Sequence, residues 1–314
     1  MSSKDLVAFF NKGAEKGNIL KWEKQLKKWY NNFKLVPLES KEAENSSIAL
    51  VWKPSIDRLL RLKKLSSIIS LGQGVDHIIH NQQLTKSISV YRIVDPYMAK
   101  SMSHWVILSI LNYIRDYDGY KLQQNNKIYK PRKFIDFKSI KIGLYGIGEI
   151  GKVVANDLAL LGFEVLGWSK TKKSNPLFKC YHDYEGFLYL NKQSDVHVCL
   201  LPLTKETENI FNRSFFSRMK SGICFINAGR GNHVVENDLL DFCQRKIDLA
   251  ILDVFKNEPL EKNHPFWNQE NIIIWPHVSA ETNAETAAQQ VSEAIKLIHS
   301  KKIPKNKVDL NLGY

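Results

Sequence analysis

The sequence has few cysteines and no long apolar run. Its 314 residues include only Cys180, Cys199, Cys224 and Cys243, which are widely spaced and form no C-x-x-C pair. Such spacing argues against a disulfide framework or a zinc site and favours buried free thiols. No apolar run approaches the roughly 20 residues that span a bilayer, and the first residues lack the layout of a signal peptide. We therefore expect a soluble, cytoplasmic protein with no metal and no membrane partner.

Acidic side chains are in the minority, since 32 Asp and Glu stand against 45 Lys and Arg, which gives a net charge of +13. Such an excess can indicate a nucleic-acid partner. Here the lysines are spread along the chain among acidic residues, and no nucleic-acid motif is present. We therefore expect no nucleic-acid partner. The length, with 44% hydrophobic residues, fits two domains of about 150 residues each.

The first hundred residues alternate strand-like and helix-like patterns. Apolar runs predict strands at 48–52, 67–71 and 88–91, and a helix near 56–62. Strands that alternate with helices indicate a parallel sheet covered on both faces. The sequence therefore predicts a smaller α/β domain at the start of the chain.

A long helix is predicted from residue 96 to about 124, and a polar segment follows it. The alternation of strands and helices then resumes, with strands predicted at 140–145, 163–168, 196–201, 223–227, 249–253 and 272–275. A last helix is expected at about 282–300. This order is typical of a doubly wound sheet.

We predict an α/β fold of two Rossmann-like domains, each with a doubly wound parallel sheet, and a deep interdomain cleft. Residues 96–284 are predicted to form the larger Rossmann domain, and the glycine pattern that follows its first strand makes it the dinucleotide-binding one. Residues 1–95 together with 285–314 are predicted to form a flavodoxin-like, substrate-binding domain.

A glycine pattern follows the strand predicted at 140–145. Gly146, Gly148 and Gly151 form a G-x-G-x-x-G turn that opens a helical pattern. This order is typical of the turn in which main-chain N–H groups and a helix N-terminus hold the phosphates of a dinucleotide. The sequence therefore predicts cofactor contacts by these glycines and by the intervening Glu149 and Ile150.

The next strand ends without an acidic residue to bind a ribose 2′-hydroxyl. Ser169, Lys170, Thr171 and Lys172 follow Trp168 instead. A basic segment at this position favours a cofactor that carries a 2′-phosphate. We therefore predict NADPH (NADP) as the cofactor and these four residues as its contacts, with NADH less favoured.

Three ionisable residues, Arg230, Glu258 and His277, lie in the loops after the last three predicted strands. In an open α/β sheet, ligands bind beyond the carboxyl ends of the strands. Reduction of a 2-oxo acid needs a proton donor, a cation for the carboxylate and a carboxylate that keeps the donor protonated. We predict that His277 is the acid, Glu258 its partner, and Arg230 the ligand of the substrate carboxylate and carbonyl.

In order and spacing, these motifs resemble those of the D-isomer-specific 2-hydroxyacid dehydrogenases. The matching segments span nearly the whole chain and are 70–76, 146–151, 201–204, 227–231, 252–260 and 276–278. Segments 168–173 and 308–314 are similar to the branch of this family that reduces glyoxylate and hydroxypyruvate.

The resemblance implies further contacts. Main-chain N–H groups of Gln73 and Gly74 are expected to bind the substrate carboxylate, and Trp52 is either a core residue or a wall of the substrate pocket. Cofactor contacts are implied for Leu201, Pro202, Ala228, Gly229, Arg230, Asp253 and His277. The implied reactions are glyoxylate to glycolate and hydroxypyruvate to D-glycerate, with hydride from nicotinamide C4, in a homodimer formed through the dinucleotide-binding domain.

Two alternatives stay open. One is a reductase of bulkier 2-oxo acids such as phenylpyruvate, because the sequence does not give the size of the pocket. The other is a non-catalytic cofactor-sensing module on the same fold, which has no need of the three ionisable residues. Two departures from the branch, His104 in place of glutamate and Tyr129 in place of tryptophan, bear on substrate preference or dimer packing.

Overall fold

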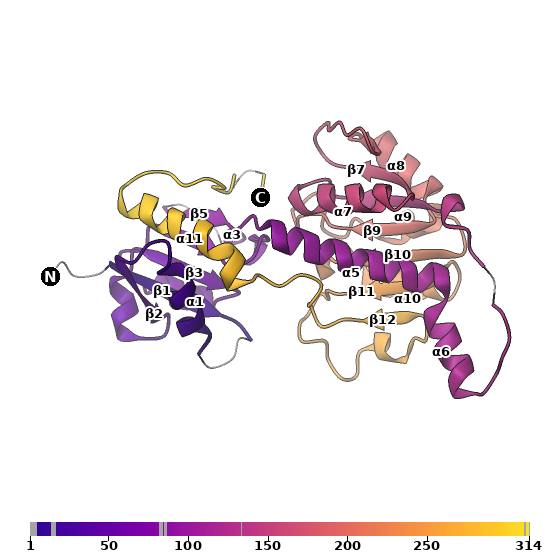
Figure 1. The fold of residues 1–314 in the computed structure, drawn as a ribbon, viewed down its shortest axis with the longest axis horizontal. Helices are drawn as coiled ribbons and strands as arrows, with labels where there is room; N and C mark the ends of the chain where they lie inside the picture. Colours follow the sequence, from indigo (N-terminus) through magenta and orange to yellow (C-terminus); the bar gives the residue numbers. More distant parts are fainter. Residues whose placement is uncertain are drawn as a thin grey trace. The chain divides into compact units, whose positions relative to one another are not determined.

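The chain divides into two compact units, residues 1–98 with 281–314 and residues 99–280 (Figure 1). A computed structural model describes residues 5–13, 17–81, 84, 87–132, 134–310 and 312–313. Asn311 and Tyr314, from the motif predicted at 308–314, lie outside the described residues. The unit boundaries fall close to the predicted domain boundaries at 95 and 284. The binding role of each domain stays a prediction, and so does the cleft.

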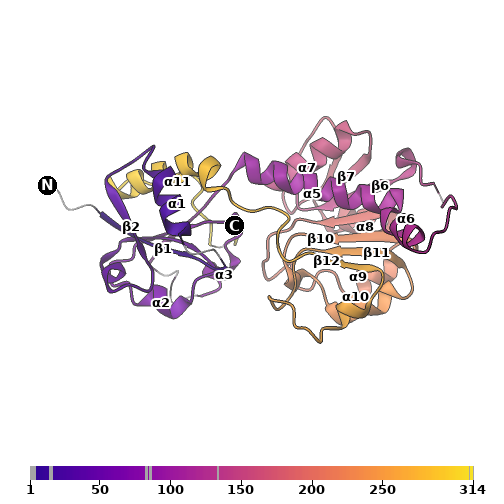
Figure 2. The ribbon, with the colours of Figure 1, turned by 60° about the horizontal axis from the view of Figure 1, so that its bottom comes forward.

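The first unit contains a parallel sheet with the strand order β2-β1-β3-β4-β5. Its strands are β1 Asp5–Asn11, β2 Phe33–Pro37, β3 Ile48–Trp52, β4 Ser67–Ser70 and β5 Ser89–Arg92. Its helices are α1 Asn18–Leu26, η1 Lys41–Asn45, α2 Ile56–Leu60, α3 Asp76–Ile79 and α11 Ala284–His299. Side chains of α1 and α11 share one core cluster with the sheet, and those of α2 and α3 share another. Figure 2 shows α1 and α11 on one side of this sheet and α2 on the other. Both faces of the sheet are therefore covered, in the strand order of a flavodoxin-like fold.

The second unit contains a longer parallel sheet with the strand order β12-β11-β10-β9-β6-β7-β8. Its strands are β6 Lys141–Tyr145, β7 Glu164–Trp168, β8 Lys179–Tyr181, β9 Val196–Cys199, β10 Ile223–Asn227, β11 Ile247–Leu252 and β12 Ile272–Ile274. Its helices are α5 Pro96–Arg115, α6 Tyr117–Asn125, η2 Phe137–Ser139, α7 Glu149–Leu160, α8 Tyr184–Gln193, α9 Arg213–Arg218, η3 Gly231–His233, α10 Glu236–Cys243 and η4 Pro265–Asn268.

Helices cover both faces of this second sheet. Val106 of α5 and Val154 of α7 belong to the core on one face, and Phe216 of α9 and Phe242 of α10 belong to the core on the other. Figure 2 shows α5 and α7 on one side of the sheet and α9 and α10 on the opposite side. The strand order reverses between β6 and β9, and ligands bind at the carboxyl ends of the strands beside such a reversal. The predicted α/β fold with two Rossmann-like parallel sheets is confirmed.

The long helix predicted from 96 to 124 is wrong in one respect, because it is interrupted. α5 ends at Arg115 and α6 begins at Tyr117. Asp116 between them is in the left-handed region, with φ 49° and ψ 47°, a conformation that a short polar side chain tolerates better than most. Its carboxylate pairs with Arg132 from the segment beyond α6. The break therefore coincides with a contact that the apolar periodicity does not reveal.

Candidate active site

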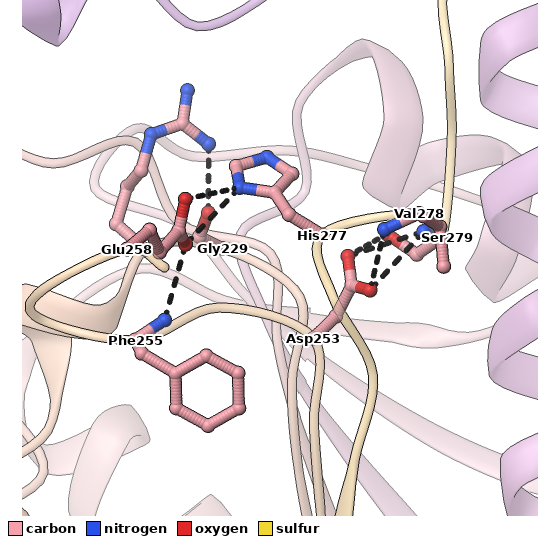
Figure 3. A network of polar contacts seen from close by, with 8 residues as sticks. Gly229, Asp253, Phe255, Glu258, His277, Val278 and Ser279 are labelled. Carbon is pink, nitrogen blue, oxygen red and sulfur yellow. Dashed lines mark hydrogen bonds and ion pairs between the residues drawn. The ribbon is translucent and has the colours of Figure 1, made fainter. Parts of the chain in front are cut away.

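His277 and Glu258 form a pair at the carboxyl edge of the second sheet (Figure 3). Nδ1 of His277 lies 2.9 Å from Oε2 and 3.1 Å from Oε1 of Glu258. The side chains are 28% and 22% exposed, so both are half-buried. Oε1 of Glu258 also accepts a hydrogen bond from the main-chain N–H of Phe255 at 3.2 Å. The geometry orients the imidazole with Nδ1 toward the carboxylate, which leaves Nε2 on the other side of the ring.

Asp253 holds the chain just after His277. It follows β11 and is buried, and its carboxylate accepts hydrogen bonds from the N–H of Val278 at 2.8 Å and from the N–H and hydroxyl of Ser279 at 3.2 and 2.5 Å. His277 itself has a positive φ of 59°, which is unfavourable for a residue with a side chain. The bonds to Asp253 hold the main chain directly after this less favourable conformation. Asp253 was predicted as a cofactor contact, and that role stays a prediction.

Arg230 lies in the loop between β10 and η3. Its Nη1 donates to the carbonyl of Gly229 at 2.7 Å, and its own carbonyl accepts from Nδ2 of Asn227 at 3.0 Å. The next residue, Gly231, packs so tightly that a Cβ on it would lie 1.9 Å from the carbonyl carbon of Phe255. The loop of Arg230 therefore lies against the loop whose main chain binds Glu258.

The glycine turn between β6 and α7 has the shape of a phosphate cradle. Gly146 has a φ of 109°, and a Cβ on Gly151 would lie only 1.8 Å from the carbonyl oxygen of Gly146. Gly148 is different, because a Cβ there would have no protein atom within 4 Å. Gly148 is also the N-cap of α7, so no side chain caps the first N–H groups of the helix. Open space in front of uncapped N–H groups fits the pyrophosphate of a dinucleotide.

The basic segment after β7 is only partly exposed. The Ser169 side chain is buried, and its hydroxyl donates to the carbonyl of Thr171 at 2.6 Å. Lys170 and Lys172 are exposed. Lys170 also forms an ion pair at 2.7 Å with Glu206, from the segment after β9. Glu206 belongs to none of the predicted motifs, since it is far from Lys170 in the chain.

The other predicted cofactor contacts surround this edge of the sheet. Leu201 and Pro202 follow β9, and Ala228 and Gly229 follow β10. Leu201, Ala228 and Gly229 are buried, and Pro202 is exposed. Glu149 and Ile150 open α7. Glu149, Ile150, Leu201 and Pro202 follow β6 and β9, the two strands between which the order reverses, and Ala228 and Gly229 follow the neighbouring strand β10. Their contacts with a cofactor stay predictions.

The predicted substrate residues of the first unit lie at the end of β3 and in the loop after β4. Trp52 is half-buried at the end of β3, and a Cβ on Gly72 would lie 2.3 Å from Cζ3 of its indole. The Ser70 hydroxyl accepts from the N–H of Gly72 at 3.3 Å and donates to the carbonyl of Gly74 at 3.2 Å. The loop that carries Gln73 is therefore held between the Trp52 ring and Ser70. Binding of a carboxylate there stays a prediction.

The cysteines occur as thiols, and Cys199, Cys224 and Cys243 are buried. Within the part of the chain that the structure describes, no group of three His, Cys, Asp or Glu side chains could hold a metal ion. In the same described residues, no helix is long and apolar enough to cross a bilayer.

Comparison with known proteins gives a consistent result. Residues 107–279 match the family model of the D-isomer specific 2-hydroxyacid dehydrogenase, NAD binding domain. Glyoxylate/hydroxypyruvate reductase A of Yersinia enterocolitica is 34% identical over 279 residues, which cover 87% of this chain and 89% of that protein.

Two solved structures are also similar. A D-isomer specific 2-hydroxyacid dehydrogenase from Xanthobacter autotrophicus, in complex with NADPH and MES, has a TM-score of 0.90 and 30% identity over the full length of both chains. The NADPH-dependent glyoxylate/hydroxypyruvate reductase of Sinorhizobium meliloti, in complex with NADP and sulfate, has a TM-score of 0.90 and 28% identity, over 99% of this chain and 100% of that one.

Proposed function

We propose that this chain, which belongs to the D-isomer specific 2-hydroxyacid dehydrogenase family, is an NADPH-dependent reductase of small 2-oxo acids. The reactions are glyoxylate to glycolate and hydroxypyruvate to D-glycerate. The observation that carries the proposal is the pair formed by His277 and Glu258 beside the loop of Arg230. A proton donor held by a carboxylate, next to a cation, suits the reduction of a carbonyl beside a carboxylate.

In this mechanism His277 protonates the carbonyl oxygen of the substrate. Glu258 accepts a hydrogen bond from the Nδ1–H of the imidazolium and stabilises its charge, so Nε2 is the atom that donates the proton. The Arg230 guanidinium binds the substrate carboxylate and polarises the carbonyl. After the proton leaves, the neutral imidazole keeps its bond from Nδ1 to Glu258, and solvent restores the Nε2 proton.

The cofactor proposal is NADPH. The N-terminus of α7 and the open space at Gly148 accommodate the pyrophosphate, and Lys170 and Lys172 supply positive charge for a 2′-phosphate. When bound, the cofactor supplies the hydride from nicotinamide C4. The two relatives crystallised with NADPH or NADP support this choice.

A steady-state panel tests the whole proposal. The purified protein is assayed with glyoxylate, hydroxypyruvate, pyruvate and phenylpyruvate, each with NADPH and with NADH. We expect the highest kcat/KM for glyoxylate or hydroxypyruvate with NADPH. A higher kcat/KM for phenylpyruvate than for glyoxylate and hydroxypyruvate would instead identify a reductase of bulkier 2-oxo acids. Binding of NADPH without turnover of any 2-oxo acid would favour a cofactor-sensing module.

We also propose a homodimer formed through the second unit. α6 contributes no buried residue, and large apolar side chains are exposed along α5, α6 and the segment after them, among them Leu111, Leu122, Tyr129 and Phe134. A surface of this kind is usually covered by a partner. Light scattering after size exclusion should give twice the chain mass for the wild type. Tyr129→Asp with Phe134→Asp should give a monomer, while Leu20→Asp, at an exposed position of α1, should not.

A cytoplasmic location is proposed as well, because the four cysteines are thiols and thiols persist where the compartment is reducing. Cell fractionation followed by alkylation of the thiols tests this. Recovery in an oxidising compartment would contradict it.

A further inference from the structure

His233, at the end of η3, lies between two loops that follow neighbouring strands. Its side chain is completely buried. Nδ1 accepts a hydrogen bond from the main-chain N–H of Arg230 at 3.0 Å, and Nε2 lies 3.3 Å from the carbonyl oxygen of Pro202. One imidazole therefore bridges the loop after β10 and the loop after β9. His233 belongs to none of the motifs predicted from the sequence.

The hydrogen-bond partners determine the state of the ring. The N–H of Arg230 is a donor, so Nδ1 carries no proton, and the carbonyl of Pro202 is an acceptor, so Nε2 carries one. The Sγ atom of Cys199 lies 3.5 Å from Nδ1, and burial raises the pKa of this thiol to about 12. A protonated thiol is also a donor, in agreement with a neutral ring protonated only on Nε2.

The main chain of Arg230 is bound at both of its polar groups. Its carbonyl accepts from Nδ2 of Asn227 at 3.0 Å and from the N–H of His233 at 3.2 Å, and its N–H donates to the imidazole. A Cβ on Gly229 would lie 3.0 Å from the same ring. The ring therefore sets both the path and the orientation of the chain at the point where the guanidinium side chain leaves it.

We propose that His233 is a positioning residue that fixes Arg230 relative to the Pro202 loop. The guanidinium that binds the substrate carboxylate and the loop that borders the cofactor site then keep a constant position relative to each other. This inference rests on the proposed function of Arg230. His233 touches neither substrate nor cofactor in this role and acts only through the two loops. A small displacement of a charged ligand is enough to lower the rate strongly.

Two amide variants separate the two hydrogen bonds. In His233→Asn the side-chain oxygen reaches the place of Nδ1, so the bond from the Arg230 N–H is kept and the one to Pro202 is lost. In His233→Gln the side-chain nitrogen reaches the place of Nε2, so the bond to Pro202 is kept and the one from Arg230 is lost. Each variant lacks one buried hydrogen bond, so each is the stability control of the other. Thermal unfolding shows whether their midpoints match.

The expected result is an unequal loss. His233→Gln should lower kcat/KM for glyoxylate by about tenfold to a hundredfold, mainly through KM, and leave the Kd of NADPH within about threefold. His233→Asn should keep kcat/KM for glyoxylate at saturating NADPH within about threefold and raise the Kd of NADPH by about tenfold. Hydrogen exchange of the peptide around Arg230 should quicken in His233→Gln only.

An equal fall of kcat/KM in both variants, or normal kcat/KM in His233→Gln, overturns the inference and assigns His233 to packing alone. Unchanged hydrogen exchange at Arg230 in His233→Gln overturns it too, since the bond would then not hold the chain. A wild-type protein that turns over no 2-oxo acid is a different result, because it rejects the proposed function itself.

Discussion

Ser279, two residues beyond His277, donates a hydrogen bond from its hydroxyl to the buried carboxylate of Asp253 at 2.5 Å. The bond joins the segment after β12 to the end of β11. Because Glu258 orients the imidazole and Asp253 anchors the following main chain, His277 is held from two directions. A catalytic group fixed in this way loses little freedom when the substrate binds.

Ser279→Ala should therefore lower kcat by about tenfold while the protein stays folded, because Asp253 keeps the main-chain N–H bonds and loses only the hydroxyl. Steady-state kinetics with glyoxylate and the Kd of NADPH measure the effect. If Asp253 acts only as a cofactor contact, the variant should change the Kd and leave kcat as it was, which would contradict an anchoring role.

His277→Gln should reduce kcat by about a hundredfold to ten-thousandfold, since it removes the proton donor but keeps a side chain of similar size. An unchanged midpoint of thermal unfolding is the control for an intact fold, and the Kd of NADPH, measured by fluorescence, tests separately whether His277 also contacts the cofactor. Near-normal turnover of glyoxylate by this variant would remove His277 from the chemistry.

Gly148→Ala should leave the free energy of unfolding nearly unchanged, because the added Cβ meets no protein atom within 4 Å. The same Cβ occupies space in front of the α7 N-terminus, so the Kd of NADPH should rise by about tenfold or more. Gly151→Ala is the matched comparison. Its Cβ would overlap the carbonyl oxygen of Gly146, and we expect a loss of stability above about 1 kcal/mol. Normal NADPH affinity in Gly148→Ala would place the pyrophosphate elsewhere.

The sequence predicts best what depends on local periodicity. β10 was predicted with its observed bounds, and the short apolar runs of β3 and β6 were found because strands buried on both faces are continuously hydrophobic. β8, an edge strand of three residues, and the strands β1 and β2 were not predicted. β8, Lys179–Tyr181, contains no apolar run, whereas β12, which is equally short, consists of three isoleucines and was predicted.

The residues of the candidate site also fall into those that the sequence predicts and those that it does not. Arg230, Glu258 and His277 were found because strand ends of a parallel sheet meet at one edge. His233, Ser279 and Glu206 were not, because each acts through a contact with a residue far away in the sequence or through main-chain geometry. A buried histidine three residues after an arginine has no distinctive pattern until the neighbouring loop is in place.

Cofactor preference should depend on the lysines after β7. Lys170→Ala with Lys172→Ala should raise KM for NADPH by about tenfold or more and leave KM for NADH nearly unchanged, because only NADPH carries the 2′-phosphate. Lys192→Ala, which removes a positive charge at an exposed position of α8, is the control. Equal rises in KM for NADPH and for NADH would show that the lysines act through the positive electrostatic potential of the surface and do not bind the 2′-phosphate.

His197 gives a prediction for stability against pH. It is buried on β9, with Nδ1 3.1 Å from the Tyr145 hydroxyl, and burial, with a smaller contribution from Lys220, lowers its pKa to about 3. Between this value and the unfolded pKa of about 6.5, the unfolded chain binds a proton that the folded chain does not, so stability falls as the pH falls through this range.

From about pH 7.5 to about pH 5 the wild type should lose about 2 kcal/mol more than His197→Asn, which cannot titrate. Urea unfolding at several pH values measures both proteins, and contributions shared by the two chains, including that of His299, cancel in the difference. If the free energies of unfolding of the two proteins change with pH in parallel, His197 is protonated in the folded protein or becomes hydrated without loss of stability.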